Sequence, residues 1–234
     1  SRIGAPPIFI LMRHKVSLGA RYIKMKIGGA PMREDVERVR VVRQAVGDDV
    51  EVMVDANNAY SVLDAVKIAR LLEPYRPYWF EEPIHAEDYA GLARVRAGTS
   101  IPIAAGENEY TRYGFRDLIA CGGVDILQPD ANVLGGITEW RHIASLASAY
   151  RLPLAPHGSS DLHVHLVAAV SNGLIVESVI TEGEVRKGMW HEKLTLDRDG
   201  MISPPERPGH GRTLNEEWVQ EHRVAGADSR RTFQ

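Results

Sequence analysis

Three carboxylates are evenly spaced along the 234-residue chain, each near the end of a short apolar run. Asp55, Glu81 and Glu107 follow one another at intervals of 26 residues. This spacing predicts equivalent positions on three consecutive strands, where the side chains would meet at one edge of a parallel sheet. Facing carboxylates repel unless a cation lies between them, and an all-oxygen set suits Mg²⁺. We therefore predict a magnesium site; three separate exposed carboxylates are the alternative.

Glu82 is the rival of Glu81 as a metal ligand, because the two glutamates are adjacent in the chain. Successive residues of a strand point to opposite faces, so only one of the two can face the metal. The even spacing favours Glu81.

Lys24 and Lys26 form a Lys-Met-Lys motif ahead of the carboxylates. Residues two apart on a strand share a face, so both ammonium groups are expected to point into the site. Close like charges should lower the pKa of at least one lysine, as a general base requires, while the other neutralises a substrate carboxylate. The alternative is an exposed edge strand with two solvated lysines, and the position ahead of the acidic residues favours the site.

A second acid/base group is predicted on the other side of the site. Asp130 in a Gln-Pro-Asp sequence and His157 in a Pro-His-Gly sequence end neighbouring expected strands. The aspartate would fix the imidazole tautomer and raise its basicity. Glu177, at the end of the last expected strand, is either a protonated hydrogen-bond donor or part of a core salt bridge. The other eight histidines are interpreted as structural, among them His163 and His165, which point in different directions on an expected helix.

The elements that must position these residues follow a βα pattern. Helical periodicity is expected from Glu34 to Val46, after the N-cap Ser61, and over Thr138–Tyr150 and Asp161–Ser171. Apolar, β-branched runs predict strands at Tyr22–Ile27, Val50–Asp55, Tyr78–Glu81, Ile101–Ala105, Val124–Gln128, Leu152–Ala155 and Leu174–Glu177. Such units suit a doubly wound open sheet or a (β/α)8 barrel. Reactive residues at seven successive strand ends converge on one place, the mouth, only in a barrel. We therefore predict a barrel.

The barrel is expected to span residues 21–190. Residues 1–20 are interpreted as an N-terminal remnant or as a first barrel strand at Ile8–Leu11, and residues 191–234 as a C-terminal hairpin and tail. Within that tail a hairpin is expected around Asp199-Gly200 and a short helix near Asn215–His222.

Composition excludes several classes of protein. The formal net charge of −3 at pH 7 gives no reason to expect nucleic acid or an anionic membrane as partner. No apolar run has the roughly 18 residues that a membrane helix needs. The apolar residues 6–12 form a poor signal peptide. A single cysteine, Cys121, excludes an internal disulfide, so a cytoplasmic protein is expected.

Taken together, these residues resemble the enolase superfamily and, within it, the mandelate racemase-like subgroup. The likeness covers Tyr22 to about Trp218. Lys24-Met25-Lys26 resembles the family's Lys-x-Lys motif, and Asp130 with His157 resembles its Asp–His dyad. Asp55, Glu81 and Glu107 resemble its magnesium ligands, and Glu177 its carboxyl donor to substrate.

The resemblance implies a Mg²⁺-dependent (β/α)7β barrel that abstracts the proton α to a carboxylate. The sequence from Gly106 to Arg116 and the run Pro156–Ser160 are most similar to sugar-acid dehydratases, including rhamnonate dehydratase-like enzymes. A lyase that converts an aldonate or aldarate to a 2-keto-3-deoxy acid is therefore expected, as a homo-oligomer. A racemase or epimerase of a 2-hydroxy acid, or a silent metal-binding barrel, is the alternative.

One feature departs from the resemblance. Family members carry an N-terminal capping domain that closes the barrel mouth, and no such domain precedes the barrel in this sequence. The chain is therefore interpreted as a fragment or as a reduced homologue, and alone it is expected to be a poor catalyst because its site stays wet.

Overall fold

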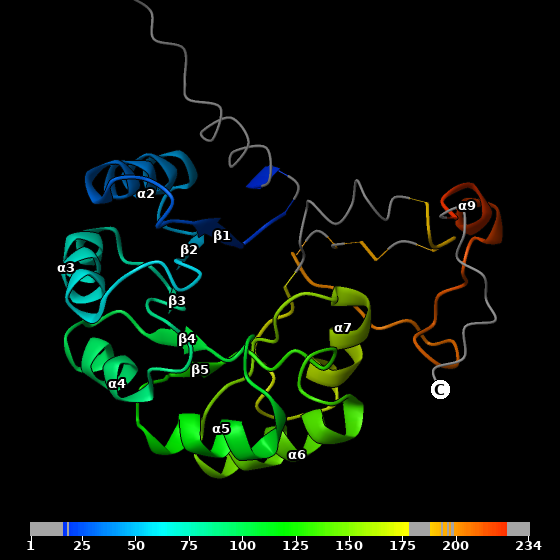
Figure 1. Cartoon of the computed structure of the whole chain (residues 1–234). Coiled ribbons are helices and arrows are strands. Elements are labelled where there is room, and N and C mark those ends of the chain that lie inside the picture. Colours follow the sequence, from blue (N-terminus) through cyan, green and yellow to red (C-terminus); the bar gives the residue numbers. More distant parts are fainter. Residues whose placement is uncertain are drawn as a thin grey trace, which may run out of the picture.

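Parallel strands in this protein curve into an arc whose outer side is covered by helices (Figure 1). The computed structural model describes residues 16–17, 19–177, 188–192, 194–195, 197 and 199–223. The strands pair in chain order: β1 (Tyr22–Lys26), β2 (Glu51–Asp55), β3 (Phe80–Glu81), β4 (Ile103–Ala105) and β5 (Ile126–Leu127). A doubly wound sheet reverses its strand order at a switch point, and the described strands show no reversal. This order is that of a barrel.

The arc continues beyond β5 through single bridges. Leu154 pairs in parallel with Leu127 on one side and with Gly173 on the other. Each of the two expected strands is thus reduced to a single bridge in the structure. The bridge at Leu154 lies within the expected strand Leu152–Ala155, whereas the bridge at Gly173 lies one residue before the expected strand Leu174–Glu177. The strand expected at Ile8–Leu11 lies outside the described residues, and the division at residue 190 stays a prediction.

In the described part of the chain, eight helical elements alternate with the strands or follow them. They are α2 (Met32–Val46), α3 (Val62–Leu72), the 3₁₀ turn η1 (Glu73–Tyr75), α4 (Tyr89–Ala97), α5 (Thr111–Ala120), α6 (Ile137–Ala149), α7 (Ser160–Ala168) and α9 (Glu216–Glu221). The expected N-cap at Ser61 is confirmed, since its side chain accepts a hydrogen bond from the backbone N–H of Asp64. Among the described residues, no helix has the length and apolarity needed to cross a membrane.

The strands separate two apolar layers. Between strands and helices lies the main core, with Phe80, Ile103 and Leu127 fully buried. A smaller cluster faces the inside of the arc and consists of Met53, Trp79, Ala104, Ile126 and Ala155. This inner layer forms the floor beneath the polar residues at the strand ends.

The described residues from 188 to 223, together named the C-terminal segment, lie beside the arc rather than within it (Figure 1). Arg212 Nη1 lies 3.2 Å from a carboxylate oxygen of Asp161 in α7, and Arg21 Nε donates to the carbonyl of Asp199 at 3.0 Å. The turn of the expected hairpin is present, because the Asp197 N–H donates to the Met201 carbonyl at 2.9 Å. The C-terminal segment is thus attached near both ends of the arc.

Candidate active site

Strand pairing places the reactive residues of the first three strands side by side. Lys26 is paired with Asp55 across β1 and β2, and Asp55 with Glu81 across β2 and β3. Each is the last residue of its strand, so all three lie at the carboxyl-terminal edge of the sheet. Lys26 Nζ is 2.5 Å from Asp55 Oδ2, and the side chains of Asp55 and Glu81 are fully buried.

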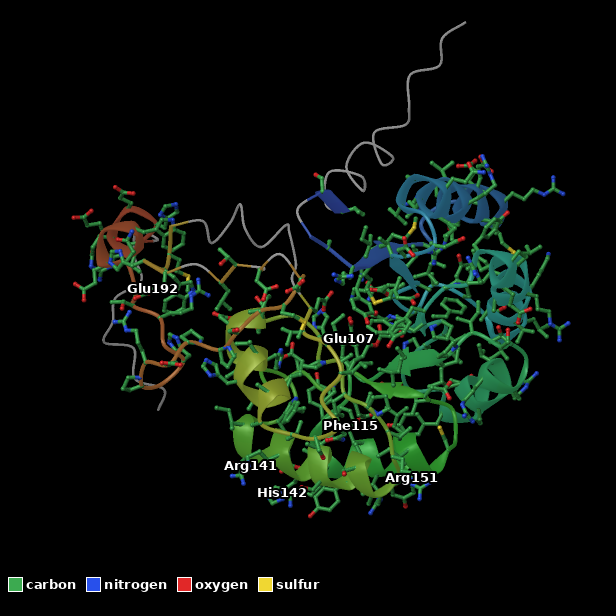
Figure 2. The ribbon with its side chains drawn as sticks, turned by 180° about the vertical axis from the view of Figure 1, so that it is seen from behind. Glu107, Phe115, Arg141, His142, Arg151 and Glu192 are labelled. Atoms are coloured by element: carbon green, nitrogen blue, oxygen red, sulfur yellow. The ribbon has the colours of Figure 1, made fainter. Side chains whose placement is uncertain are left out.

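Glu107 joins this group from a loop. One carboxylate oxygen from each of Asp55, Glu81 and Glu107 lies within 4.8 Å of the other two. Glu107 follows the end of β4 by two residues, so the expectation of equivalent strand positions is wrong for it. The chain turns at Gly106, which has a φ of +131°. Figure 2 shows Glu107 on the inner side of the arc, far from Glu192 in the C-terminal segment.

Burial and mutual repulsion act on these carboxylates. Burial raises the pKa of Glu81, and Asp55 adds to the rise although Lys24 opposes it. Burial also raises the pKa of Glu107, with Glu82 among the groups that add to it. Glu107 Oε2 is buried without a hydrogen-bond partner among the described residues. A divalent cation would offset the repulsion among these carboxylates and would bind this oxygen. The set of oxygen donors therefore fits Mg²⁺.

Glu82 is buried outside this acidic group. Its carboxylate accepts hydrogen bonds at 2.7–3.4 Å from three amide side chains, those of Asn57, Asn58 and Asn108. Asn57 also donates to Glu107 at 3.3 Å. Glu82 therefore ties together the loops after β2, β3 and β4, while the structure groups Glu81 with Asp55 and Glu107.

The two lysines contact these carboxylates in different ways. Lys24 is 17% exposed, and its Nζ lies 2.8 Å from Glu81 Oε1 and 2.5 Å from Glu177 Oε1. Burial alone would lower the pKa of Lys24, but these two carboxylates outweigh it and raise that pKa. The lowered pKa expected of at least one lysine is thus not that of Lys24, because anions surround this ammonium group. Lys26 is 60% exposed at the open edge.

Asp130 and His157 meet as the sequence predicted. His157 Nδ1 lies 3.2 Å from Asp130 Oδ2, and His157 Nε2 lies 3.7 Å from Glu107 Oε2. The hydrogen bond to Asp130 outweighs burial and, with Glu107, raises the pKa of His157 to about 9. Burial would raise the pKa of Asp130, but hydrogen bonds from His157 and Asn132 keep it below its usual value. The imidazole is therefore held as a cation beside the acidic group.

Glu177 acts as a hydrogen-bond acceptor in this structure. It accepts from the Gly158 N–H at 2.7 Å and forms the ion pair with Lys24. This arrangement matches the salt-bridge interpretation, and the role of a protonated donor stays a prediction. Through the bond from Gly158, Glu177 also links the end of the last expected strand to the loop of His157.

A family model described as Enolase C-terminal domain-like matches residues 11–218. The chain belongs to this family. The resemblance to the enolase superfamily and its mandelate racemase-like subgroup is therefore confirmed, and the barrel expected for an enolase C-terminal domain agrees with the strand order.

Two curated relatives and one solved structure illustrate the likeness. 3,6-Anhydro-α-L-galactonate cycloisomerase of Streptomyces coelicolor is 38% identical over 84% of this chain and 54% of its own length. Arabinonate dehydratase of Saccharolobus solfataricus is 37% identical over 89% of this chain and 57% of its own. L-talarate dehydratase from Polaromonas sp. JS666, complexed with Mg and L-glucarate, has a TM-score of 0.83 at 38% identity, covering 91% of this chain and 59% of that one. The chain thus spans little more than half the length of these relatives.

Several residues of this enolase C-terminal domain site were not predicted from the sequence. Asn57 and Asn132 each donate a backbone hydrogen bond at 2.9 Å to the aspartate two positions earlier. The signal was present as a repeated Asp-Ala-Asn sequence at residues 55–57 and 130–132. Trp79 Nε1 donates to Glu81 Oε2 at 2.9 Å, and its position two residues before a strand-end glutamate was the available signal.

Proposed function

We propose that the chain carries the metal-binding and acid/base part of a sugar-acid dehydratase. Its substrate would be an aldonate or aldarate, and its product a 2-keto-3-deoxy acid. The observation that carries the proposal is the order of groups at the strand ends, where Lys26 contacts Asp55 on one flank of the acidic group and His157 lies beside Glu107 on the other. The dehydratase relatives support this choice of reaction.

Asp55, Glu81 and Glu107 are proposed to hold one Mg²⁺. When bound, the ion supplies a Lewis acid that stabilises negative charge developing on the substrate carboxylate. Three buried or half-buried carboxylates with raised pKa values at Glu81 and Glu107 support this proposal.

Lys26 and His157 are proposed to act on opposite sides of the substrate. Lys26 takes the proton from the α-carbon, and the electron pair left behind expels the β-hydroxyl. His157 gives its proton to that hydroxyl, which leaves as water, and the resulting enol becomes the 2-keto acid. The raised pKa of His157 keeps this proton available at neutral pH. Lys24, held as a cation by Glu81 and Glu177, is proposed to bind the substrate carboxylate.

An isomerase is the second candidate, supported by the cycloisomerase among the relatives. Both reactions begin with removal of the α-proton. They differ in whether the β-hydroxyl leaves or the carbon is reprotonated, and the two flanking groups serve either outcome. A silent metal-binding barrel is the third candidate, although a chain that only binds metal has no need of Lys26 and His157.

A panel of aldonic and aldaric acids with Mg²⁺ tests the proposal, beginning with arabinonate and L-talarate. Formation of a 2-keto-3-deoxy acid supports a dehydratase, and the Asp55→Asn variant should abolish it. Loss of optical rotation without keto product supports the isomerase. Neither change, with Mg²⁺ still bound, supports the silent barrel. The cytoplasmic location and the homo-oligomeric state stay predictions.

A further inference from the structure

His163 is buried between the two loops that carry Asp130 and His157. It lies in the first turn of α7 and has 0% exposure. Its Nε2 accepts a hydrogen bond from the Ala131 N–H at 3.1 Å, and its Nδ1 lies 2.7 Å from the carbonyl oxygen of Gly158. Ala131 follows Asp130, and Gly158 follows His157. One imidazole thus joins the neighbours of both proposed acid/base residues.

The two backbone partners determine which ring nitrogen carries the proton. A backbone N–H can only donate, so Nε2 must carry the lone pair and Nδ1 the hydrogen. Nδ1–H then donates to the Gly158 carbonyl. Burial lowers the pKa of His163, which favours the same neutral form.

A neutral His163 leaves Asp130 free to serve His157. His163 Nε2 lies 3.6 Å from Asp130 Oδ1, close enough for an ion pair if the ring were charged. In the tautomer described above this nitrogen has no proton to share, so it does not compete with His157 for the carboxylate.

The loop after His157 requires such a link. Gly158 and Ser159 both have left-handed backbone conformations, with φ of +58° and +38°. A left-handed serine is unfavourable unless its surroundings hold it in place. Asn132 donates to Ser159 Oγ at 2.7 Å and forms a partly exposed bridge between the two loops, while His163 forms the buried one.

We propose that His163 is a positioning residue, which keeps Asp130 and His157 within hydrogen-bond distance by joining their loops. The inference rests on the proposed function only in naming this pair as acid/base groups. His163 contacts the backbone on both sides and reaches the reaction through His157, so it is not itself catalytic.

The test uses two variants at this position and one matched control. His163→Leu removes both hydrogen bonds at a similar side-chain volume, and His163→Gln keeps an amide that can both donate and accept. His165→Leu is the control, because His165 lies two residues further along α7 and contacts the His210 carbonyl in the C-terminal segment.

The first readout is NMR of ¹⁵N-histidine-labelled protein with Mg²⁺, in which His157 signals are assigned from their loss in His157→Asn. We expect His163 to be the neutral Nδ1–H tautomer in the wild type. We also expect His163→Leu to shift or broaden the His157 ring signals, while His165→Leu leaves them unchanged. An Nε2–H or doubly protonated His163 would overturn the inference, and this measurement on the wild type needs no variant to fold.

The second readout is turnover of an acid that the wild type dehydrates. We expect kcat to fall about 10- to 100-fold in His163→Leu, with KM and Mg²⁺ affinity nearly unchanged and partial recovery in His163→Gln. Wild-type kcat together with unchanged His157 signals in His163→Leu would refute the positioning role. If the wild type dehydrates no acid but the His157 signals respond to His163→Leu, the proposed function fails and the positioning role stands.

Discussion

Two cationic side chains of the candidate site, Lys24 and His157, differ in their exposure to solvent because their surroundings differ. Lys24 and His157 are both cations beside carboxylates, yet Lys24 is 17% exposed among three anionic groups and the His157 side chain is 36% exposed. His157 can therefore reach a substrate and lose its proton, while Lys24 stays charged. This difference supports the proposed roles of His157 in proton transfer and of Lys24 in charge neutralisation.

Turnover is expected to fall as the pH rises through the pKa of His157. The bond to Asp130 and the attraction of Glu107 raise this pKa from 6.5 to about 9 against the effect of burial. Mg²⁺ bound to Glu107 would weaken the attraction of Glu107 for the imidazolium and leave the hydrogen bond to Asp130 in place. The descending limb of the kcat profile against pH should therefore lie between pH 6.5 and pH 9. Asp130→Asn should move the limb to lower pH. A kcat profile with the same limb in both proteins would contradict the assignment.

The raised pKa of His157 also makes the free energy of unfolding depend on pH. A group whose pKa is raised by folding contributes its full stabilisation below the unfolded pKa and loses it as the pH rises through the folded one. For His157 the free energy of unfolding should thus decrease from pH 6.5 to pH 9, and His157→Asn should flatten that decrease. Urea unfolding at several pH values measures both.

Hydrogen exchange at the α-carbon separates the two acid/base residues. Lys26→Ala should lose both exchange and dehydration by about 10²–10⁴-fold, because no other group takes the α-proton on that side. His157→Asn should lose dehydration but keep exchange, since only departure of the hydroxyl needs its proton. Incubation of the substrate in D₂O, followed by NMR, provides the measurement. Wild-type exchange and turnover in both variants would show that neither residue has the proposed role.

Adjacent glutamates provide a matched pair for the metal site. Glu81→Gln should lower Mg²⁺ affinity at least about 100-fold, because it removes a ligand from the acidic group. Glu82→Gln should have a smaller effect, since Glu82 contacts asparagine side chains instead. Calorimetric titration with MgCl₂ measures both affinities. Loss of binding in Glu82→Gln alone would mean that the even spacing identified the wrong glutamate.

At the level of elements, the strand ends were predictable and the loops beyond them were not. Apolar β-branched runs followed by a polar residue located Lys26, Asp55 and Glu81 correctly. Several expected strands are shorter in the structure. The strand expected from Ile101 begins at Ile103, because Pro102 has no N–H to donate. The offset of Glu107 could not be predicted, since spacing along the chain says nothing of a turn with positive φ at Gly106.

The loop between β4 and α5 carries the next prediction. A Cβ at Gly106 would lie 2.9 Å from Phe115 Cε1, in a backbone conformation that favours glycine. Gly106→Ala should therefore destabilise the fold by about 1–3 kcal/mol and also weaken Mg²⁺ binding, because Glu107 follows directly. Gly122→Ala is the control, with a φ of +68° and nothing within 4 Å of the added Cβ. It should cost stability without changing Mg²⁺ affinity, and equal affinities in both variants would contradict the link from Gly106 to Glu107.

His163 shows a further limit of sequence reasoning. Spacing on the expected helix correctly separated it from His165, and both were then interpreted as structural. Periodicity compares residues on one helix only, whereas the partners of His163 lie on two loops at Ala131 and Gly158. The repeated Asp-Ala-Asn sequence was a usable signal for Asn57 and Asn132, because each asparagine has the same relation to the aspartate before it.

Over the whole molecule, the ion pair between Lys24 and Glu177 joins β1 to the segment that follows the bridge at Gly173. The Nζ–Oε1 distance is 2.5 Å, and the two side chains are 17% and 18% exposed. The sequence placed Lys24 within the first expected strand and Glu177 at the end of the last one. It did not predict their contact, because a pairing between the two ends of a barrel depends on how the barrel closes. The ion pair is therefore a contact that connects the two ends of the described part of the barrel.

A double-mutant cycle on this pair is the last prediction. Lys24→Met should destabilise the fold by about 3 kcal/mol in EDTA, because it leaves Glu81 and Glu177 without their cation. Glu177→Gln should cost less, since Lys24 keeps Glu81 at 2.8 Å. The coupling energy of the pair should lie at about 0.5–3 kcal/mol, as for other residues in contact. Lys67→Met, at an exposed position of α3, should have almost no effect.

Mg²⁺ should change the two single variants differently. The ion would offset the charge that Lys24→Met leaves on Glu81, so the cost of this variant should shrink when MgCl₂ replaces EDTA. The cost of Glu177→Gln should change less, because Glu177 lies outside the acidic group of Asp55, Glu81 and Glu107. Urea unfolding of the wild type, the two single variants, the double variant and the Lys67→Met control in both buffers measures these differences. A coupling energy of zero would mean that the contact does not hold the ends of the arc together, and an equal cost of Lys24→Met in both buffers would place Mg²⁺ away from Glu81.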